Sequence, residues 1–195
     1  GNADIVLLYA LYCSRAGRSD EAHTAIQRSL ALDPINARVH RAAGSIDYSS
    51  RQYADALPPL KRALELNPKI SNAHGLAGFS LMQMGRLDEA KAEFEAEPAE
   101  FFRLTGLAIA EHKLGNGPAA EKAYTELIKA MGDAALYQHA EILAQWGRLD
   151  EAVAKLWRAR QIGDSGLTNL ATDPLLDPIR QHPKFIELLN ELRLG

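Results

Sequence analysis

The chain has 195 residues, of which 47% are hydrophobic and 24% charged, the ordinary balance of a protein with a sizeable core. This length suits one large domain or one array of repeats. The net charge of −3 and the mixing of charges argue against broad nucleic-acid binding, because that affinity rests on clustered Lys and Arg. The single cysteine, Cys13, excludes an internal disulfide and a cysteine-rich metal site.

Targeting signals are sparse in this sequence. No apolar stretch approaches about 20 residues, the length that a membrane-spanning helix needs. No segment resembles a signal peptide, and we expect a cytoplasmic protein. The helical pattern already begins at residue 3 and the first residue is Gly, so we also expect further sequence upstream.

The first two elements form a predicted helical hairpin. Residues 3–15 and 19–32 carry apolar side chains three and four positions apart, which is the period of an α-helix. Gly17 suits the left-handed turn between them, and Ser19 is predicted to cap the second helix. Asp20 and Glu21 then fall in the first turn of that helix, where the helix dipole favours negative charge.

This turn returns along the chain. The hexamer Gly-Arg-Leu-Asp-Glu-Ala at 85–90 recurs unchanged at 147–152, and with one substitution at 17–22. Its last residue marks a register with spacings of 34, 34, 30 and 32 residues: Ala22, Ala56, Ala90, Ala120 and Ala152. A larger apolar residue follows four positions after each alanine: Ile26, Leu60, Phe94, Tyr124 and Leu156. The pattern predicts a small residue where two helices touch and a large one that fills the gap beside it.

These features resemble the tetratricopeptide repeat, a helix-turn-helix unit of about 34 residues with Ala-x-x-x-Phe in its second helix and a closing Pro. The closing Pro is present at Pro34 and Pro68, and the resemblance covers about residues 3–164. It implies an all-α, right-handed superhelix of five helix-turn-helix repeats with C-terminal capping helices, because such helix pairs bury their apolar faces only by stacking. We therefore predict one repeat-array domain over residues 1–195, with a cap at 165–195 and repeats at about 3–36, 37–70, 71–100, 101–132 and 133–164.

The first helices match the family less well than the second helices. The family's Leu-Gly pair is present only as Ala43-Gly44 and Ala77-Gly78. Its bulky aromatic is replaced by Val6, His40, His74, Leu104 and Leu136. We therefore expect the packing on that side of the repeats to be particular to this chain.

Prolines mark three departures from the repeat. Pro58 and Pro59 fall early in a second helix, where a slight kink is expected because the first turn tolerates a missing N–H. Pro98 follows Ala90 by only 8 residues, against 12 between Ala56 and Pro68, so the second helix of repeat three should be shorter by about one turn. Pro118 opens the second helix of repeat four in a favoured position.

The repeat pattern stops after residue 164. Pro174, Pro178 and Pro183 divide the rest into short helices, of which the last is predicted at about 183–193. The segment Asp-Pro-x-Leu-x-Pro-Ile-Arg-x-x-Pro-x-Phe resembles the tail that closes tetratricopeptide arrays at the C-termini of bacterial signalling proteins, among them cyclases, kinases and transcription regulators. This second resemblance covers about 20 residues.

The reactive side chains do not form a recognisable catalytic or metal-binding constellation. No two of the six histidines are three or four positions apart, as ligands on one helical face would be. His40 and His74 are 34 residues apart and are expected to stack between helices, and Cys13 to be a packing residue. Asp173, Asp177 and Glu187 are predicted as caps or solvent-facing residues. We predict no enzyme activity, no metal and no cofactor.

The tetratricopeptide resemblance instead implies a binding groove lined by the first helix of each repeat. Leu7, Leu11, Glu141 and Gln145 lie on this predicted stripe. The site residues predicted to contact a partner there are Arg15, Arg38, Arg41, Tyr48, Asn72, Phe79, Met82, Gln83, His112, Lys113 and Tyr137. The set is basic at one end and rich in aromatic residues and Met in the middle, and such residues are enriched where proteins bind partners. Each of these residues has helix packing or a solvated face as an equal alternative. The Lys and Asn set with which some relatives hold a C-terminal carboxylate is not matched.

We therefore predict a non-catalytic scaffold that binds an acidic-hydrophobic peptide or helix of a partner protein, without nucleic acid or membrane insertion. Arg38, Arg41 and Lys113 would attract acidic groups. Tyr48, Phe79 and Met82 would pack with apolar ones. The alternative is a regulatory or dimerisation segment of a larger bacterial signalling protein, which the tail and the abrupt N-terminus suggest. A homodimer is compatible with either function.

Overall fold

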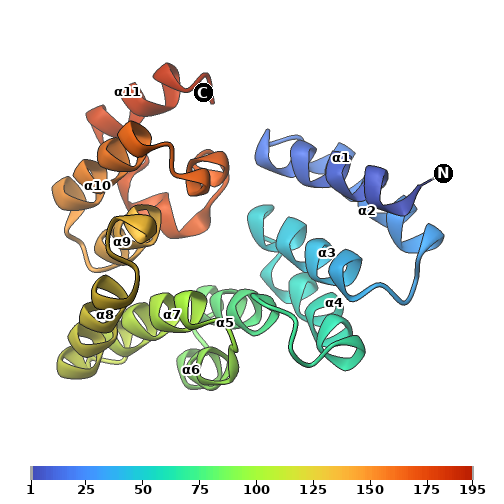
Figure 1. Ribbon diagram of the computed structural model, residues 1–195, viewed down its shortest axis with the longest axis horizontal. Helices are drawn as coiled ribbons and strands as arrows, with labels where there is room; N and C mark the ends of the chain where they lie inside the picture. Colours follow the sequence, from blue (N-terminus) through green and yellow to red (C-terminus); the bar gives the residue numbers. More distant parts are fainter. Residues whose placement is uncertain (1, 195) are drawn as a thin grey trace. The chain divides into compact units, whose positions relative to one another are not determined.

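A computed structural model describes residues 2–194, and within them all regular structure is helical, with eleven α-helices, three short 3₁₀ segments and no strand (Figure 1). The all-α class and the helical-repeat fold are therefore confirmed. None of the described helices is long and apolar enough to cross a membrane. The chain divides into two compact units, Gly1–Arg103 and Leu104–Gly195, which are described separately.

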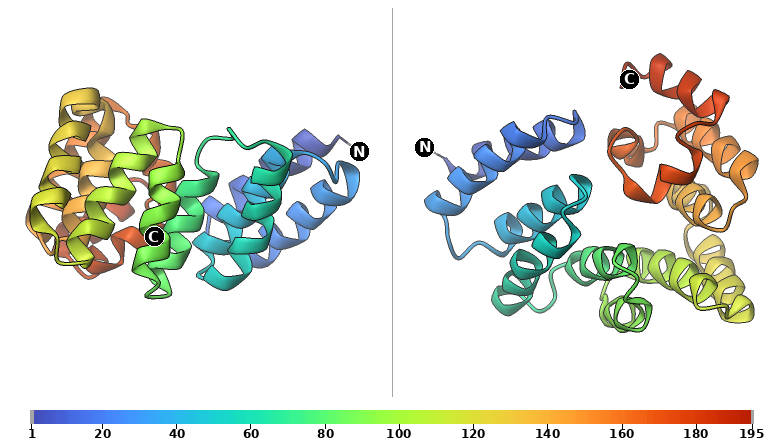
Figure 2. Two further views of the ribbon diagram at one scale, coloured as in Figure 1. Left: turned by 90° about the horizontal axis from the view of Figure 1, so that it is seen from below. Right: turned by 180° about the vertical axis from the view of Figure 1, so that it is seen from behind.

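The first unit consists of three helix pairs that follow one another along the chain (Figures 1 and 2). In each pair two consecutive helices pack together, and the first helix of a later pair also packs on the pair before it. The helices are α1 (Ala3–Arg15), α2 (Ser19–Leu32), α3 (Ala37–Ser49), α4 (Tyr53–Leu66), α5 (Ala73–Gln83) and α6 (Leu87–Ala96). The predicted bounds of the first pair are confirmed, and α4 continues through Pro58 and Pro59.

The second unit begins within α7 (Glu100–Lys113), which crosses the boundary between the units. It continues with α8 (Gly117–Met131), the 3₁₀ turn η1 (Gly132–Ala135), α9 (Leu136–Gln145) and α10 (Leu149–Ile162). The C-terminal segment holds two more 3₁₀ turns and a short helix, which are η2 (Ser165–Asn169), η3 (Pro174–Ile179) and α11 (Pro183–Glu191). The last predicted helix is thus confirmed, with Phe185 and Leu188 buried beneath it.

The residues at the register positions of the recurring alanines form the core of the fold. All five alanines of the register are buried, and so is the larger residue that follows each by four positions. Two glycines of the first helices show how closely the pairs approach. A Cβ added to Gly44 would lie 2.4 Å from Cγ of Leu60, and one added to Gly78 would lie 2.5 Å from Cε1 of Phe94. The Ala-Gly pairs therefore accept the large residue of the second helix against the bare backbone.

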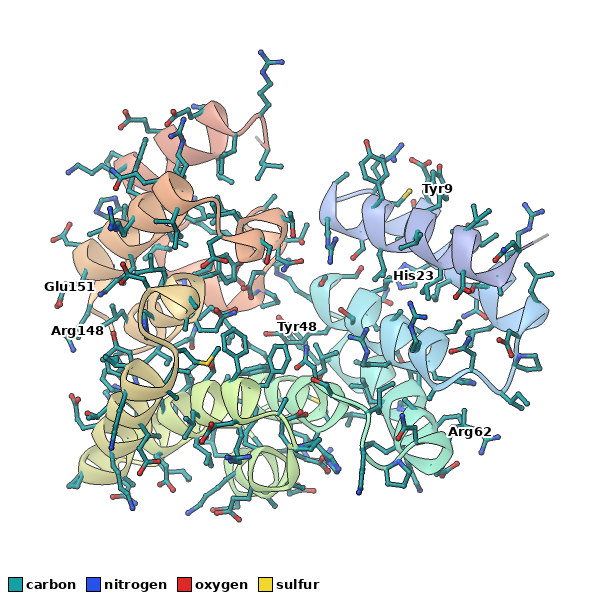
Figure 3. The ribbon with its side chains drawn as sticks, viewed as in Figure 1. Tyr9, His23, Tyr48, Arg62, Arg148 and Glu151 are labelled. Carbon is teal, nitrogen blue, oxygen red and sulfur yellow. The ribbon has the colours of Figure 1, made fainter. Side chains whose placement is uncertain are left out.

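The hexamer acts as a turn and a helix start, as its recurrence predicts. Gly85 and Gly147 adopt φ of +78° and +77°, in the left-handed region that favours glycine. The arginine that follows makes two hydrogen bonds to the glutamate three positions later, and Figure 3 shows one such pair, Arg148 and Glu151, side by side. The predicted cap at Ser19 is wrong. This residue is the first of α2, and the N-cap position belongs to Arg18, which makes no capping bond through its side chain.

The shortened second helix of repeat three is confirmed, since α6 has 10 residues where α4 has 14. Because α6 ends at Ala96, the segment that follows it turns Glu97 into the interior. Its carboxylate accepts hydrogen bonds from the backbone N–H groups of Asn72 (2.9 Å), Gly75 (2.9 Å) and Ala99 (3.1 Å). Asn72 has a left-handed backbone (φ +63°) and makes no capping bond through its side chain. A carboxylate from the next loop therefore satisfies the orphan N–H groups at the start of α5.

Candidate binding surface

The C-terminal segment covers the face of α9 on which the sequence predicts a binding stripe. The hydroxyl of Tyr137 donates to Oδ2 of Asp173 (2.8 Å), and Nε2 of Gln145 donates to the backbone oxygen of Leu175 (2.7 Å). Tyr137 is only 1% exposed. Its predicted role as a partner contact is therefore corrected, because the chain's own tail already occupies this position.

Two buried carboxyl groups lie at the centre of this contact. Burial raises the pKa of Glu141 well above its usual range, and the neighbouring Asp173 charge raises it further. Burial also raises the pKa of Asp173, although hydrogen bonds from Glu141, from the Leu175 N–H and from Tyr137 oppose the shift. Two carboxyl groups held together away from water favour sharing one proton over carrying two negative charges. The prediction that Asp173 is a cap is confirmed by its bond to Leu175, but its burial beside Glu141 was not predicted.

The tail contacts identify which register positions of a first helix meet an added segment. Tyr137, Glu141 and Gln145 stand 15, 11 and 7 residues before the register alanine Ala152. The same three positions of α1 carry Leu7, Leu11 and Arg15, those of α3 carry Arg41, Ser45 and Ser49, and those of α5 carry Gly75, Phe79 and Gln83. We call these nine residues the first-helix positions. The last of the three positions is Arg15, Ser49, Gln83 and Gln145 in repeats one, two, three and five, each with a side-chain donor.

Two arginines on α3 give the first unit its positive charge on this side. Arg38 is exposed and lies 4.0 Å from Asp4, with both side chains largely in solvent, so this pair contributes little. Arg41 is half-buried one turn away. Burial and the charge of Arg38 lower the pKa of Arg41, while Glu97 opposes them. A carboxylate from a partner would relieve the repulsion between the two guanidinium groups.

The apolar members of the predicted site belong largely to the core. The ring of Phe79 lies between those of Tyr48 (6.2 Å between centroids) and Phe94 (4.9 Å), and all three are buried along with Met82. Figure 3 shows Tyr48 within the body of the first unit. Their predicted role is therefore corrected from partner contact to support, since little of their surface is left to cover.

The remaining predicted residues are distributed between the units. Arg15 is exposed and Gln83 and Asn72 are partly so in the first unit. His112 and Lys113 are exposed in the second unit, where the His112 ring stacks on Trp146 at 5.3 Å between centroids. The indole N–H of Trp146 donates to the Ala108 backbone oxygen (3.1 Å), so this tryptophan ties α9 to α7.

The histidines have individual partners. His40 bonds to the backbone oxygen of Pro34 (2.9 Å), whereas His74 bonds to Glu93 (2.7 Å) and links α5 to α6, so the two equivalent histidines have different partners. His23 bonds to Asp47 (2.8 Å) and links α2 to α3, as Figure 3 indicates. Among residues 2–194, no group of three or more His, Cys, Asp or Glu side chains is placed to hold a metal ion. Cys13 is buried.

Comparison with known families bears on the repeats directly. Two family models, both described as tetratricopeptide repeat, match residues 10–69 and 48–102. The chain belongs to the tetratricopeptide-repeat family. The matched region holds the complete pairs α3–α4 and α5–α6, together with most of α1–α2. A comparison with curated protein sequences gives no match.

Solved structures share the fold of this tetratricopeptide protein. MamA of MSR-1 is 25% identical, with a TM-score of 0.55 over 67% of this chain and 79% of its own. PilW, described as a type IV pilus biogenesis factor, is 17% identical, with a TM-score of 0.62 over 100% of this chain and 94% of its own. PilF of Pseudomonas aeruginosa is 16% identical, with a TM-score of 0.61 over 99% and 92%. The last two likenesses concern the fold alone.

Proposed function

We propose that this tetratricopeptide protein is a non-catalytic interaction scaffold, and that the exposed and partly exposed first-helix positions on α1, α3 and α5 bind an acidic segment of a partner protein. The observation that carries the proposal is the C-terminal tail on α9. At the equivalent register positions of α9, the chain already holds an added segment: the side chain of Gln145 donates a hydrogen bond to a backbone carbonyl of the tail. In the first unit, the members of these positions that are exposed or partly exposed are Leu11, Arg15, Arg41, Ser45, Ser49 and Gln83.

The residues at these positions suggest the chemistry of the partner. Gln83 occupies the place of Gln145, whose amide donates to the tail backbone, so Gln83 would donate to a backbone carbonyl of the partner. Arg15, Arg38 and Arg41 would pair with acidic side chains, and guanidinium groups bind carboxylates with two parallel bonds. Ser45 and Ser49 have short side chains that leave the backbone of α3 open to a segment lying across it. An extended acidic peptide meets these requirements better than a basic or wholly apolar one.

A binding titration tests this proposal. The probes are short synthetic peptides in which Glu alternates with Leu, and matched peptides in which Lys replaces Glu. We expect wild-type protein to prefer the Glu series, and the Arg38→Glu, Arg41→Glu double variant to lose at least about tenfold in affinity, because like charges would then face each other. Gln83→Ala should weaken binding of both series by a smaller factor, since it removes a bond to the peptide backbone.

The control is Arg62→Glu, which makes half of that charge change at another position of the same unit. Arg62 projects outward from α4, a second helix, where it pairs with Glu65 at 3.0 Å (Figure 3). Equal affinity of the wild type and the double variant for every peptide would overturn the proposal. Equal losses in the double variant and the Arg62→Glu control would do the same, because they would show only an effect of net charge.

A cytoplasmic location and a role as the regulatory end of a larger bacterial signalling protein both depend on sequence and cellular context. The tail that motivated the second idea has a structural role in this chain, as the cover of α9. The sequence of the gene upstream of residue 1 is the direct test of the signalling alternative.

A further inference from the structure

Helix α1 exposes a row of large apolar and aromatic side chains on one face. Ile5, Leu8, Tyr9 and Tyr12 are 66%, 64%, 47% and 61% exposed. Their spacing of three, one and three residues places them along a single stripe of the helix. Figure 3 shows Tyr9 on the outer side of α1, whereas His23 lies between α2 and α3. We call these four residues the stacking face.

The repeat register shows what such a face does elsewhere in the chain. The same positions one repeat later are Val39, Ala42, Ala43 and Ile46, which are buried in one core cluster with residues of α1 and α2. Two repeats later they are Ala73, Leu76, Ala77 and Ser80, all buried. In the second and third pairs of the first unit, this stripe is therefore the surface by which a helix pair packs on another pair. In α1 it is present, enlarged by two tyrosines, and not covered by any part of the chain that the structure describes.

A hollow of about 640 Å³ lies beside the stacking face, between α1 and α2. Its two ends carry opposite charges. Asp20 and Glu21 lie at the end near Tyr9, whose hydroxyl donates to Oε2 of Glu21 (2.9 Å). Arg28 lies at the end near Ile5, because α2 runs back along α1. Within residues 2–194 the side chains of Asp20 and Arg28 have no ion-pair partner.

We propose that a second copy of this chain covers the stacking face, with the two α1 helices antiparallel about a two-fold axis. An interface of this symmetry must be complementary to itself. The antiparallel arrangement satisfies that condition, because it brings Arg28 of each copy to the acidic end, Asp20 and Glu21, of the other. Tyrosine is enriched in such interfaces, and Tyr9 is already oriented by its bond to Glu21. The proposal uses neither the first-helix positions nor the acidic partner, so the two proposals succeed or fail separately.

Sedimentation equilibrium of the whole chain tests whether the face pairs. We expect a reversible dimer with a dissociation constant on the order of 10 µM, in keeping with a small interface. Leu8→Glu should weaken dimerisation at least about tenfold, because it places like charges against each other at the centre of the interface. Ile35→Glu is the matched control, since Ile35 is 71% exposed but lies outside the helices, and it should leave the dimer intact.

A monomer at every concentration up to about 100 µM would overturn the proposal and assign the face to a different polypeptide. A dimer that Leu8→Glu and Ile35→Glu affect equally would overturn it as well. Circular dichroism of each variant establishes that it is folded. A folded monomeric Leu8→Glu variant beside a dimeric wild type supports the proposal.

Exchange of the end charges tests the antiparallel arrangement. In a dimer of the Arg28→Glu variant, the introduced glutamate of each copy would face Asp20 and Glu21 of the other. In a dimer of the double variant Asp20→Lys, Glu21→Lys, Arg28 of each copy would face two lysines. Each variant alone should therefore be largely monomeric. An equimolar mixture of the two should recover the dimer, because both ends of the mixed pair are then complementary. Failure of the mixture to associate, or dimers of each variant alone as tight as the wild type, would overturn the arrangement.

Discussion

Single side chains decide how closely the two helices of a repeat approach. The absence of a Cβ at Gly44 and Gly78 makes room for Leu60 and Phe94, which fill the gap beside the register alanines. The sequence alone indicated this arrangement, since small and large residues recur in fixed register. The buried residues that the sequence did not indicate are polar. Nothing in the spacing indicated that Glu97 would be buried, because an acidic residue beside Pro98 resembles an ordinary loop.

The close approach at Gly78 predicts a loss of stability for Gly78→Ala. The new methyl group would lie within 3 Å of the Phe94 ring, and the ring has core packing on its other sides. We expect a loss of about 1–3 kcal/mol, the usual cost of overpacking. Urea unfolding measures it, with Glu95→Ala as control, since Glu95 is exposed on the same α6. Equal midpoints for the two variants would show that the helices separate freely.

The paired carboxyl groups predict a pH-dependent effect of Glu141→Gln. An acid whose pKa is raised by folding contributes its stability below the unfolded pKa and loses it as the pH rises through the folded value. Burial raises the pKa of Glu141, so the neutral variant should be more stable than the wild type at neutral pH. The difference should shrink as the pH falls toward the ordinary pKa of a glutamic acid, because Glu141 then becomes protonated in the unfolded wild-type chain as well.

Denaturant midpoints of both chains across the acidic to neutral range measure this difference. The comparison between the chains matters, because burial lowers the pKa of His139 in the same unit and makes both proteins less stable in acid. His139 is common to both chains and cancels. A wild type more stable than the variant at neutral pH would contradict the account of the pair.

At the scale of helices, the lengths and order of the elements followed from the hydrophobic period and from the glycine and proline positions. The early end of α6 was predicted from Pro98, but its consequence was not. Because α6 is shorter, the segment after it can bring Glu97 to the start of α5. The side chain of Asn72 makes no capping bond there. Sequence reasoning assigns caps to neighbours in the chain, and this cap comes from 22 to 25 residues away.

The remote cap predicts that Glu97→Ala destabilises the first unit. Three backbone N–H groups lose their acceptor, and an unsatisfied buried donor costs about 1–3 kcal/mol. Hydrogen exchange at the amides of Asn72 and Gly75 should accelerate, and the thermal midpoint should fall. Glu100→Ala is the control, since Glu100 is exposed and forms an ion pair with Arg103 at the surface. Unchanged exchange at both amides would mean that Glu97 does not cap α5.

At the scale of the whole molecule, the sequence indicated the family and the helical-repeat fold but only part of the binding surface. The tail was recognised as a cap, yet its position on α9 depends on contacts between residues about 30 apart, such as Gln145 with Leu175. The tail thereby covers Tyr137, and Gln83 occupies in repeat three the place that Gln145 has in repeat five. The arginines of the first unit, Arg15 and Arg38, remain accessible as predicted.

The measurement that tests the central claim most directly is NMR of the arginine side chains during titration with the tightest-binding Glu-Leu peptide. The account predicts that the Nε–H resonances of Arg15, Arg38 and Arg41 shift together with the Gln83 amide, while those of Arg62 and Arg148 stay in place. Shifts confined to Arg62 and Arg148, or of equal size at all five arginines, would contradict the claim that α1, α3 and α5 hold the partner.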